Sequence, residues 1–252
     1  MEDTIVVKLS GKALGADKEL IELFKAASHK PVVIVHGGGV EVDALFKALK
    51  LEVKKVDGLR VSPSEQMPYI TAALGGMCNH RLQALAISAG LNAIGGLCSD
   101  GNTLKVKKLS DELGMVGVVE GKSSAYLNTL LENGMCPVLA SLAIDETGQI
   151  YNVNADDVAS CIAKLLNAPL YFISDVPGVL DKQGKLIHTL DEKTTLELIA
   201  DGTIKDGMAV KVKNALKVSL ELQKPVYIAS YKDPSLSSNL FERRRLGTAF
   251  IA

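Results

Sequence analysis

The sequence lacks the features that would direct the chain to a membrane or to nucleic acid. No apolar stretch approaches the ~20 residues needed to cross a bilayer, and the first residues show no basic segment followed by a long apolar run. Twenty-eight basic side chains against 29 acidic ones leave a formal net charge of -1. This balance gives no reason to expect nucleic acid or an anionic membrane as a partner. We therefore expect a cytoplasmic protein in which any anion site is built locally.

Paired cysteines and repeats are missing as well. The four cysteines lie far apart and form no CxxC or Cys/His pattern, so neither a disulfide framework nor a zinc site is expected. No internal repeat, low-complexity tract or Gly/Ser linker occurs. The chain has 252 residues, of which 47% are hydrophobic and 23% charged. This composition is typical of a globular protein with one large domain or two lobes.

Short β-branched runs alternate with helical patterns along the chain. Residues 5–7 and 32–35 are apolar on both faces, as in strands of a covered parallel sheet, and a helical pattern from 20 to 27 separates them. Further core strands are predicted at 92–97, 137–140, 170–173 and 226–229. Further helices are predicted at 42–49, 155–166, 194–200 and 208–222. The alternation predicts an α/β fold with a mostly parallel sheet and helices on both faces.

Other segments predict less regular features. A long helix is expected from about residue 64 to 89, with Pro68 tolerated only near its first turn. Residues 116–119 and 144–153 have the pattern of hairpin strands, the latter turning at 146–148, and another hairpin turn is expected at 181–184. Because a second series of strands and helices begins near residue 169, we predict a lobe boundary there.

Two glycine-containing turns follow predicted strands in the first part of the chain. In residues 8–11 (KLSG) the backbone can approach a ligand closely and turn its N–H groups toward an anion. Residues 36–39 (HGGG) suit a nest of amides at a helix N-terminus, which favours phosphate. This run is not a Walker A loop, since no Gly-Lys-Ser/Thr follows it, nor a GxGxxG fingerprint, since Val42 occupies the third glycine position. A surface lysine at position 8 and a merely flexible turn are the alternatives, and His36 is expected to be packed rather than catalytic.

Polar residues also mark predicted loops and helix starts further along. In residues 58–61 (GLRV), Arg60 can hold a carboxylate with two parallel hydrogen bonds, although a solvated loop is the alternative. Residues 152–156 (NVNAD) add amide donors, and Asn154 and Asp156 are also suited to helix capping. Residues 174–180 (SDVPGVL) leave a strand at the carboxyl end of the sheet, where ligands collect in open α/β folds. Residues 206–211 (DGMAVK) open a helix that carries Lys211.

Taken together, these motifs resemble those of the amino acid kinase family, in the same order and over essentially the whole chain. The closest resemblance is to the branch that phosphorylates N-acetyl-L-glutamate. It implies a three-layer α/β/α sandwich of two lobes, with the acyl amino acid bound by residues 1–168 and ATP by residues 169–252. Ser10 stands where these kinases usually carry glycine, and KLSG is also similar to the start of uridylate kinases. The segments 58–61 and 152–156 favour acetylglutamate as the substrate.

The resemblance implies transfer of a phosphoryl group from ATP to the substrate's side-chain carboxylate, a step of arginine biosynthesis. A carboxylate is a competent nucleophile at neutral pH, so positioning and charge stabilisation dominate and no general base is required. Lys8 and Lys211 would contact the transferring group from opposite sides, and Asp156 would hold both ammonium groups. Phosphoryl oxygens would be bound by the amides of Gly11, Gly38 and Gly39.

The resemblance also implies the contacts of the two substrates. The acyl amino acid would be bound by Gly38, Gly39, Arg60 and Asn152. The nucleotide would lie against Asp175, Val176, Pro177, Gly178, Val179, Leu180, Thr203, Ile204 and Lys205. Magnesium would be held by ATP's phosphates and water, so no protein side chain is named as a metal ligand.

Two other classes of function remain open. Within the family, the acceptor is alternatively uridylate, carbamate or a different carboxylate. From another class, the chain is a catalytically silent effector-binding module on the same fold, a reading disfavoured by the presence of Lys8, Lys211 and Asp156. A nicotinamide-dependent dehydrogenase is disfavoured further by the missing glycine fingerprint.

The long predicted helix also bears on assembly. It contains Ala72, Ala73, Gly75 and Gly76, small residues that permit close packing of a symmetry mate, or of neighbours in the same lobe. We expect a homodimer. Arginine-inhibited members of the branch resemble one another in an extra N-terminal helix that links dimers into a ring of six. Because the first strand is predicted to start by Thr4 or Ile5, we expect no such ring and no sensitivity to arginine.

Overall fold

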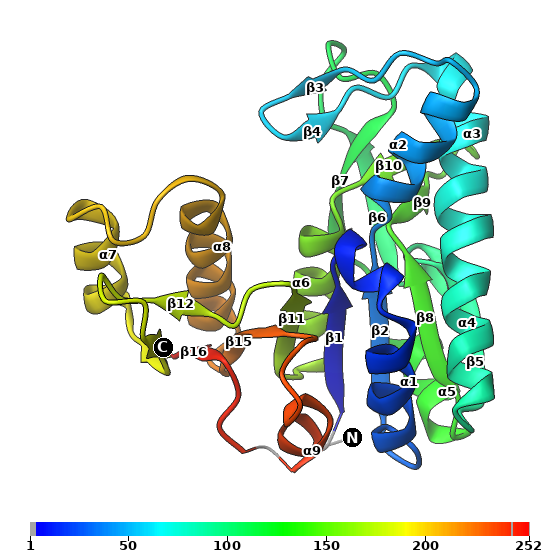
Figure 1. Cartoon of the computed structure of the whole chain (residues 1–252). Helices are drawn as coiled ribbons and strands as arrows, with labels where there is room; N and C mark the ends of the chain where they lie inside the picture. The colour runs from blue at the N-terminus through cyan, green and yellow to red at the C-terminus, as the bar shows by residue number, and fades with distance from the viewer. Residues whose placement is uncertain (1–3, 243, 252) are drawn as a thin grey trace.

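The computed structural model describes residues 4–242 and 244–251, and its largest element is an eight-stranded sheet (Figure 1). The strand order is β14-β16-β15-β11-β1-β2-β8-β5. All neighbours are parallel except β15 and β16, which confirms the mostly parallel sheet. The strands are β1 (Ile5–Leu9), β2 (Val32–His36), β5 (Ala93–Leu97), β8 (Cys136–Ala140), β11 (Leu170–Ser174), β14 (Thr189–Leu190), β15 (Val226–Ser230) and β16 (Thr248–Phe250).

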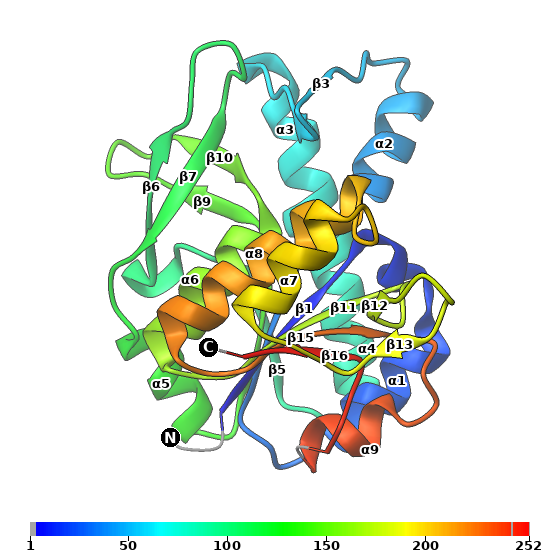
Figure 2. The same cartoon turned by 90° about the vertical axis from the view of Figure 1, so that its left-hand side faces the viewer.

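Helices cover both faces of this sheet, so the three-layer sandwich is confirmed (Figure 2). Strand alternation explains the two apolar faces. In β1, Val6 packs with one buried cluster, whereas Ile5, Val7 and Leu9 pack with the other. The first face carries α5 (Ala125–Glu132), α6 (Ala155–Leu166), α7 (Glu192–Ala200) and α8 (Asp206–Leu222). The second carries α1 (Asp17–Ala26), α4 (Asn79–Ser88) and α9 (Leu236–Phe241).

The long predicted helix is continuous but changes its winding. It begins with a 3₁₀ turn (Ser64–Gln66), continues as α3 (Met67–Thr71) and a π-helical stretch (Ala72–Cys78), and ends as α4. Pro68 lies in the first turn of α3, where its missing N–H has no helical partner to lose. The π-helical stretch was not expected from the sequence.

Smaller sheets lie beside the main one. Four strands pair in the order β6-β7-β10-β9, and the predicted hairpin at 144–153 is confirmed as β9 and β10. Strand β7 pairs in parallel with β10 and forms an antiparallel pair with β6, a strand that was not predicted. Two further hairpins are β3–β4, beside α2 (Gly39–Ala48), and β12–β13. These strands are β6 (Leu104–Lys108), β7 (Val116–Gly121), β9 (Leu142–Ile144), β10 (Ile150–Val153), β3 (Lys55–Val56), β4 (Leu59–Arg60), β12 (Val179–Leu180) and β13 (Leu186–Ile187).

The main sheet runs across the predicted lobe boundary. Strand β1 pairs in parallel with both β2 and β11, so Lys8 lies opposite Val35 on one side and Phe172 on the other. The sheet is therefore continuous across residues 168 and 169. The division of the ligand sites between two lobes stays a prediction. Within the described part of the chain, no helix combines the length and apolarity needed to cross a membrane.

Candidate active site

A cavity of about 340 Å³ lies at the carboxyl ends of the central strands. The turns after β1 and β2 line it, together with the hairpin β3–β4 and the segment that enters α6. It brings together seven predicted site residues from four separate motifs: Lys8, Gly11, Gly38, Gly39, Arg60, Asn152 and Asp156. This location agrees with the general preference of open α/β sheets for ligands beyond the carboxyl ends of their strands.

Lys8 and Asp156 form the ion pair at the centre of this arrangement. Lys8 shares the face of β1 with Val6, which packs with the cluster that contains α6 residues, and Asp156 lies in the first turn of α6. Lys8 Nζ is 2.6 Å from Asp156 Oδ1, and the two side chains are only 15% and 28% exposed. Partial burial strengthens such a pair relative to one at the surface.

Two helix N-termini meet the cavity and supply backbone N–H groups. Gly38 is the N-cap of α2, and a Cβ at this position would lie 2.7 Å from Leu74 Cδ2 and 2.8 Å from Cys78 Sγ. The α3–α4 helix therefore packs too closely for a side chain here. Asn154 is the N-cap of α6, and its Oδ1 accepts a hydrogen bond of 2.8 Å from the backbone N–H of Asp156. Helix N-termini of this kind favour anions.

Arg60 is buried in the cavity wall and held on one side. Its Nη2 donates to the carbonyl of Gly39 at 3.1 Å and to Asp43 Oδ1, and its Cζ lies 5.4 Å from the centre of the Phe46 ring. Its Nη1 is buried and has no hydrogen-bond partner among the residues that the structure describes. An unpaired buried donor of this kind is costly and is ready to receive an anionic ligand.

Asn152 is tied to the same structure by a short hydrogen-bond chain. Its Nδ2 donates to Ser62 Oγ at 3.1 Å, and this hydroxyl donates to the carbonyl of Arg60 at 3.0 Å. Ser62 is fully buried. These hydrogen bonds link Arg60 and Asn152, two of the four residues predicted to bind the acyl amino acid.

Lys211, on α8, lies beside the central ion pair. It lines a smaller cavity, of about 40 Å³, together with Lys8, Asp156, Ser10 and Ser174. The three predicted catalytic residues therefore border one space, at the carboxyl ends of β1 and β11. Of the two lysines, Lys8 is the one that forms the ion pair with Asp156 described above.

The predicted nucleotide segments lie elsewhere in the C-terminal half, and the described lining of these two cavities does not include them. In residues 175–180, Asp175 and Val176 are partly exposed, whereas Val179 is buried and its N–H donates to Thr248 Oγ1 at 2.8 Å. In residues 203–205, Ile204 is buried and Lys205 is exposed as the N-cap of α8. Both segments contain a core residue that anchors them and neighbours that face solvent. The other predicted positions lie within the same two segments: Pro177, Gly178, Leu180 and Thr203.

His36 is packed, as expected from the sequence. Its Nε2 accepts a hydrogen bond from Asn79 Nδ2 at 3.0 Å, and its Nδ1 donates to the carbonyl of Gly37 at 2.7 Å. Burial lowers the pKa of His36 to about 4, although the hydrogen bond to Gly37 opposes this effect. The imidazole is therefore neutral and fixes the strand end that carries the glycines.

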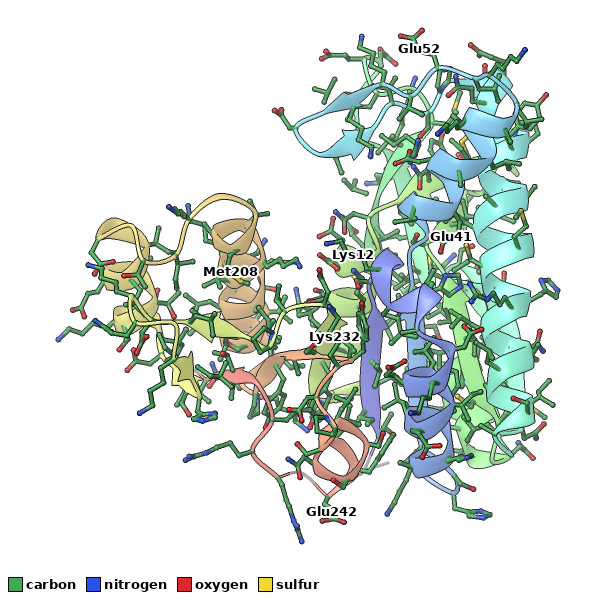
Figure 3. The ribbon with its side chains drawn as sticks, in the orientation of Figure 1. Lys12, Glu41, Glu52, Met208, Lys232 and Glu242 are labelled. Atoms are coloured by element: carbon green, nitrogen blue, oxygen red, sulfur yellow. The ribbon has the colours of Figure 1, made fainter. Side chains whose placement is uncertain are left out.

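Sequence reasoning missed four polar residues near these sites. Lys12 Nζ lies 2.7 Å from Asp175 Oδ2, and its hydrogen bond lowers the pKa of that carboxyl group. Figure 3 shows Lys12 beside the turn after β1, on the side from which α7 and α8 project. Asp43, Lys55 and Ser62 surround Arg60. The sequence contains one signal for this region, the Asp57-Gly58 dipeptide, which is typical of a two-residue hairpin turn.

Comparison with known proteins agrees with this fold and this set of motifs. The model of the amino acid kinase family matches residues 3–230. The chain therefore belongs to the amino acid kinase family. Among curated relatives, the acetylglutamate kinase of Aeromonas salmonicida is 42% identical over 253 residues, covering 98% of each chain. These matches confirm the family resemblance and the assignment as a kinase.

Two solved structures show the same fold. Protein smu.665 of Streptococcus mutans UA159 matches with a TM-score of 0.79 and 28% identity over all of both chains. The N-acetylglutamate synthase of Neisseria gonorrhoeae, complexed with coenzyme A and N-acetyl-glutamate, matches with a TM-score of 0.85 and 22% identity. That match covers 99% of this chain and 59% of the synthase, so the fold forms one part of a longer protein there.

Proposed function

We propose that this kinase transfers the γ-phosphoryl group of ATP to the side-chain carboxylate of N-acetyl-L-glutamate, forming N-acetyl-L-glutamyl 5-phosphate in arginine biosynthesis. The observation that carries the proposal is one cavity lined by cations from three strands, Lys8 of β1, Lys55 of β3 and Arg60 of β4. A dicarboxylate matches such a cavity, because Arg60 can meet one carboxylate and Lys8 the other, while Lys55 is paired with Asp43. The relatives that are named acetylglutamate kinase support the same acceptor.

In this proposal, Arg60 and Asn152 bind the α-carboxylate. The free Nη1 of Arg60 gains a partner when the carboxylate enters, which removes the ~1–3 kcal/mol cost of an unsatisfied buried donor. The apolar wall of the cavity, which includes Val42, Ile70 and Leu74, suits the acetyl group and the methylene chain.

The other end of the substrate meets the phosphoryl-transfer residues. Lys8 and Lys211 neutralise charge on the transferring group, and Asp156 orients Lys8 through its ion pair. The amides of Gly11, Gly38 and Gly39 donate to phosphoryl oxygens. Each well-placed donor of this type contributes about 2–4 kcal/mol to transition-state stabilisation.

The nucleotide is proposed to lie against residues 175–180 and 203–205. Magnesium, which would neutralise charge on the triphosphate, is proposed to arrive with ATP. Among residues 4–242 and 244–251, no cluster of three or more His, Cys, Asp or Glu side chains is arranged to hold a metal ion. Asp156, which lines the cavity, and Asp175, in one of the proposed nucleotide segments, each pair with a lysine. This donor set suits a metal held by ATP's phosphates and water.

We further propose a cytoplasmic homodimer. The thiols of Cys78, Cys98, Cys136 and Cys161 are free, which suits a reducing compartment supplied with ATP. On the long helix, Ala73 and Gly75 pack within the chain, whereas a Cβ at Gly76 would meet no atom within 4 Å in the described part of the chain beyond its own helix backbone and its two sequence neighbours. Tyr69, Met77 and Ile87 of the same helix are 40%, 57% and 54% exposed, and a second copy of the chain would cover them.

The test is hydroxamate formation in hydroxylamine, which traps an acyl phosphate. We expect product from MgATP with N-acetyl-L-glutamate, and none when a chelator removes magnesium. Parallel assays of phosphate transfer to carbamate and uridylate test the alternative acceptors. Product from either of those acceptors alone would overturn the proposed substrate. A lack of transfer to all three would favour a silent effector-binding module.

A further inference from the structure

Asp43 links the buried arginine of the cavity to the hairpin that borders it. Asp43 lies on α2, and its Oδ1 accepts a hydrogen bond from Arg60 Nη2 while its Oδ2 lies 3.0 Å from Lys55 Nζ. Arg60 and Lys55 belong to the two strands of the hairpin β3–β4. One carboxylate from a helix therefore holds one side chain from each strand.

The hairpin register explains why a carboxylate is needed here. Lys55 and Arg60 are direct cross-strand partners, so their positive charges lie opposite each other. Like charges in this position are destabilising. Asp43 contacts both and leaves the three groups with a combined charge of about +1, which matches a single carboxylate.

Asp43 also determines which part of the guanidinium group is free. Arg60 has an 8% exposed side chain, stacks on Phe46, and has its Nη2 occupied by Asp43 and the carbonyl of Gly39. Arg60 lines the cavity, and these contacts leave its buried Nη1 without a hydrogen-bond partner among the described residues. Burial alone would raise the pKa of Asp43, but the hydrogen bonds from Arg60 and Lys55 outweigh it and lower this pKa. Asp43 is therefore ionised at neutral pH.

We propose that Asp43 is a positioning residue for the acceptor's α-carboxylate. It orients Arg60 so that Nη1 faces the ligand, and through Lys55 it holds the hairpin β3–β4 at the cavity. The inference rests on the proposed function, because the ligand of Arg60 is taken to be the carboxylate of an acyl amino acid. Asp43 itself does not touch the substrate.

The main test is the substitution Asp43→Asn, which keeps the shape of the side chain and removes its charge. We expect the Kd for N-acetyl-L-glutamate, measured by calorimetry without ATP, to rise about tenfold, on the scale of one charge-assisted hydrogen bond. The KM for this substrate should rise to a similar extent, while kcat and the KM for ATP stay within about twofold. An unchanged Kd, or a fall in kcat with the same KM, would overturn the inference.

The matched control is Asp17→Asn. Asp17 also pairs with an arginine, Arg81, but both side chains are about half exposed and neither lines the cavity. We expect its Kd and KM to match those of the wild type. If both variants weaken binding equally, the effect is general and the role of Asp43 is refuted.

A double substitution asks whether Asp43 acts through Arg60. In the Arg60→Lys background the guanidinium fork is already lost, so adding Asp43→Asn should weaken binding little further. A full tenfold effect in that background would contradict the inference. If Asp43→Asn does not fold, Lys55→Met at a 48% exposed side chain removes the hairpin contact of Asp43, together with the charge of a residue that lines the cavity. We then expect a Kd about threefold higher, and an unchanged Kd would refute the role of the hairpin.

Failure of the inference is distinguishable from failure of the proposed function. Hydroxamate formation and acetylglutamate binding by the wild type establish the function before any variant is compared. If the wild type binds and turns over this substrate while Asp43→Asn behaves identically, only the positioning role is lost. If the wild type does neither, the substrate is wrong and so is the basis of the inference.

Discussion

Individual buried side chains set both the chemistry and the acid sensitivity of this protein. Lys8 and Arg60 are two of the cations that line the cavity, and each is held by a carboxylate, Lys8 by Asp156 and Arg60 by Asp43. Each is partly or fully buried, so each depends on its carboxylate partner. The two residues have different proposed roles, and substitutions should separate them.

Replacing Lys8 or Lys211 by alanine should lower kcat by about a hundredfold or more. Both are proposed to meet charge that moves during transfer, so transition-state stabilisation is lost rather than substrate affinity. Steady-state kinetics with the hydroxamate assay measures the effect, and circular dichroism checks the fold. Retained turnover in Lys8→Ala with an intact fold would remove the central mechanistic claim.

His36 should make the protein less stable in acid. Its pKa is lowered from 6.5 to about 4 by burial, so between these pH values the unfolded chain binds a proton that the folded chain does not. The free energy of unfolding should therefore fall by up to about 3 kcal/mol from pH 7 to pH 4 on account of this residue.

Denaturant unfolding of the wild type and His36→Asn at several pH values measures this contribution. The stability difference between the two proteins should shrink by that amount as the pH falls. The exposed His80 provides the control, since His80→Asn should keep the wild-type pH profile. A difference between wild type and His36→Asn that is constant with pH would contradict the assignment.

At the residue scale, the sequence predicted the site residues that lie within motifs but not the charged residues that pair with them. Lys8, Arg60 and Asp156 stand in short stretches whose neighbours, glycines and strand ends, indicate ligand contact. Asp43 has no such neighbours, and Lys12 directly follows the KLSG turn but lies outside the motif, so both have the sequence pattern of solvated charged residues. Their partners, Arg60 and Asp175, lie 17 and 163 residues away. Only tertiary folding brings such pairs together.

Among the elements, the hairpin β3–β4 is closed by a two-residue turn, Asp57 and Gly58. Asp57 and Gly58 have φ values of 50° and 82°, the left-handed geometry of a two-residue hairpin turn. Gly58 adopts this geometry without strain, and asparagine tolerates it better than alanine does. Because Gly58 and Arg60 both line the cavity, a distorted turn should disturb the substrate site.

Gly58→Ala should therefore raise the KM for N-acetyl-L-glutamate several-fold and destabilise the protein by about 1 kcal/mol, whereas Gly58→Asn should remain near the wild type. Gly148→Ala is the matched control. Gly148 has a φ of 88°, and like Gly58 it has no atom within 4 Å of a built Cβ, but it turns the hairpin β9–β10 outside the cavity lining. We expect equal destabilisation there with an unchanged KM. Equal KM values for Gly58→Ala and Gly148→Ala would refute the role of the turn.

Strong periodicity explains which elements could be predicted. The core strands and the helices α1, α2, α6 and α8 carry continuous apolar patterns, and all are confirmed. The missed elements are short or depend on a distant partner. Strand β16 has three residues and pairs with β15 and β14, and α9 is a six-residue helix with two serines. Local sequence gives such segments little preference until the sheet and the core already exist.

At the scale of the whole molecule, the outer face of the long helix should form a dimer contact. Light scattering should give the mass of two chains. Met77→Glu places a charge among the exposed apolar residues of this helix and should shift the mass toward one chain. Leu196→Glu changes a side chain of similar exposure, 53%, on α7 and should leave the mass unchanged. A wild-type monomer, or a dimer unaffected by Met77→Glu, would contradict this contact.

Because β1 lies between β2 and β11, the spacing of the strands sets the distance between the two proposed sites. The proposed acceptor site extends from the end of β2, and the proposed nucleotide site from the end of β11. Adjacent strands are about 4.8 Å apart, so these two ends are separated by about 10 Å, with Lys8 between them. The backbone ladder fixes this spacing, whatever side chains surround it. A change of acceptor would then require new side chains only on the β2 side, while the path of the phosphoryl group keeps its length.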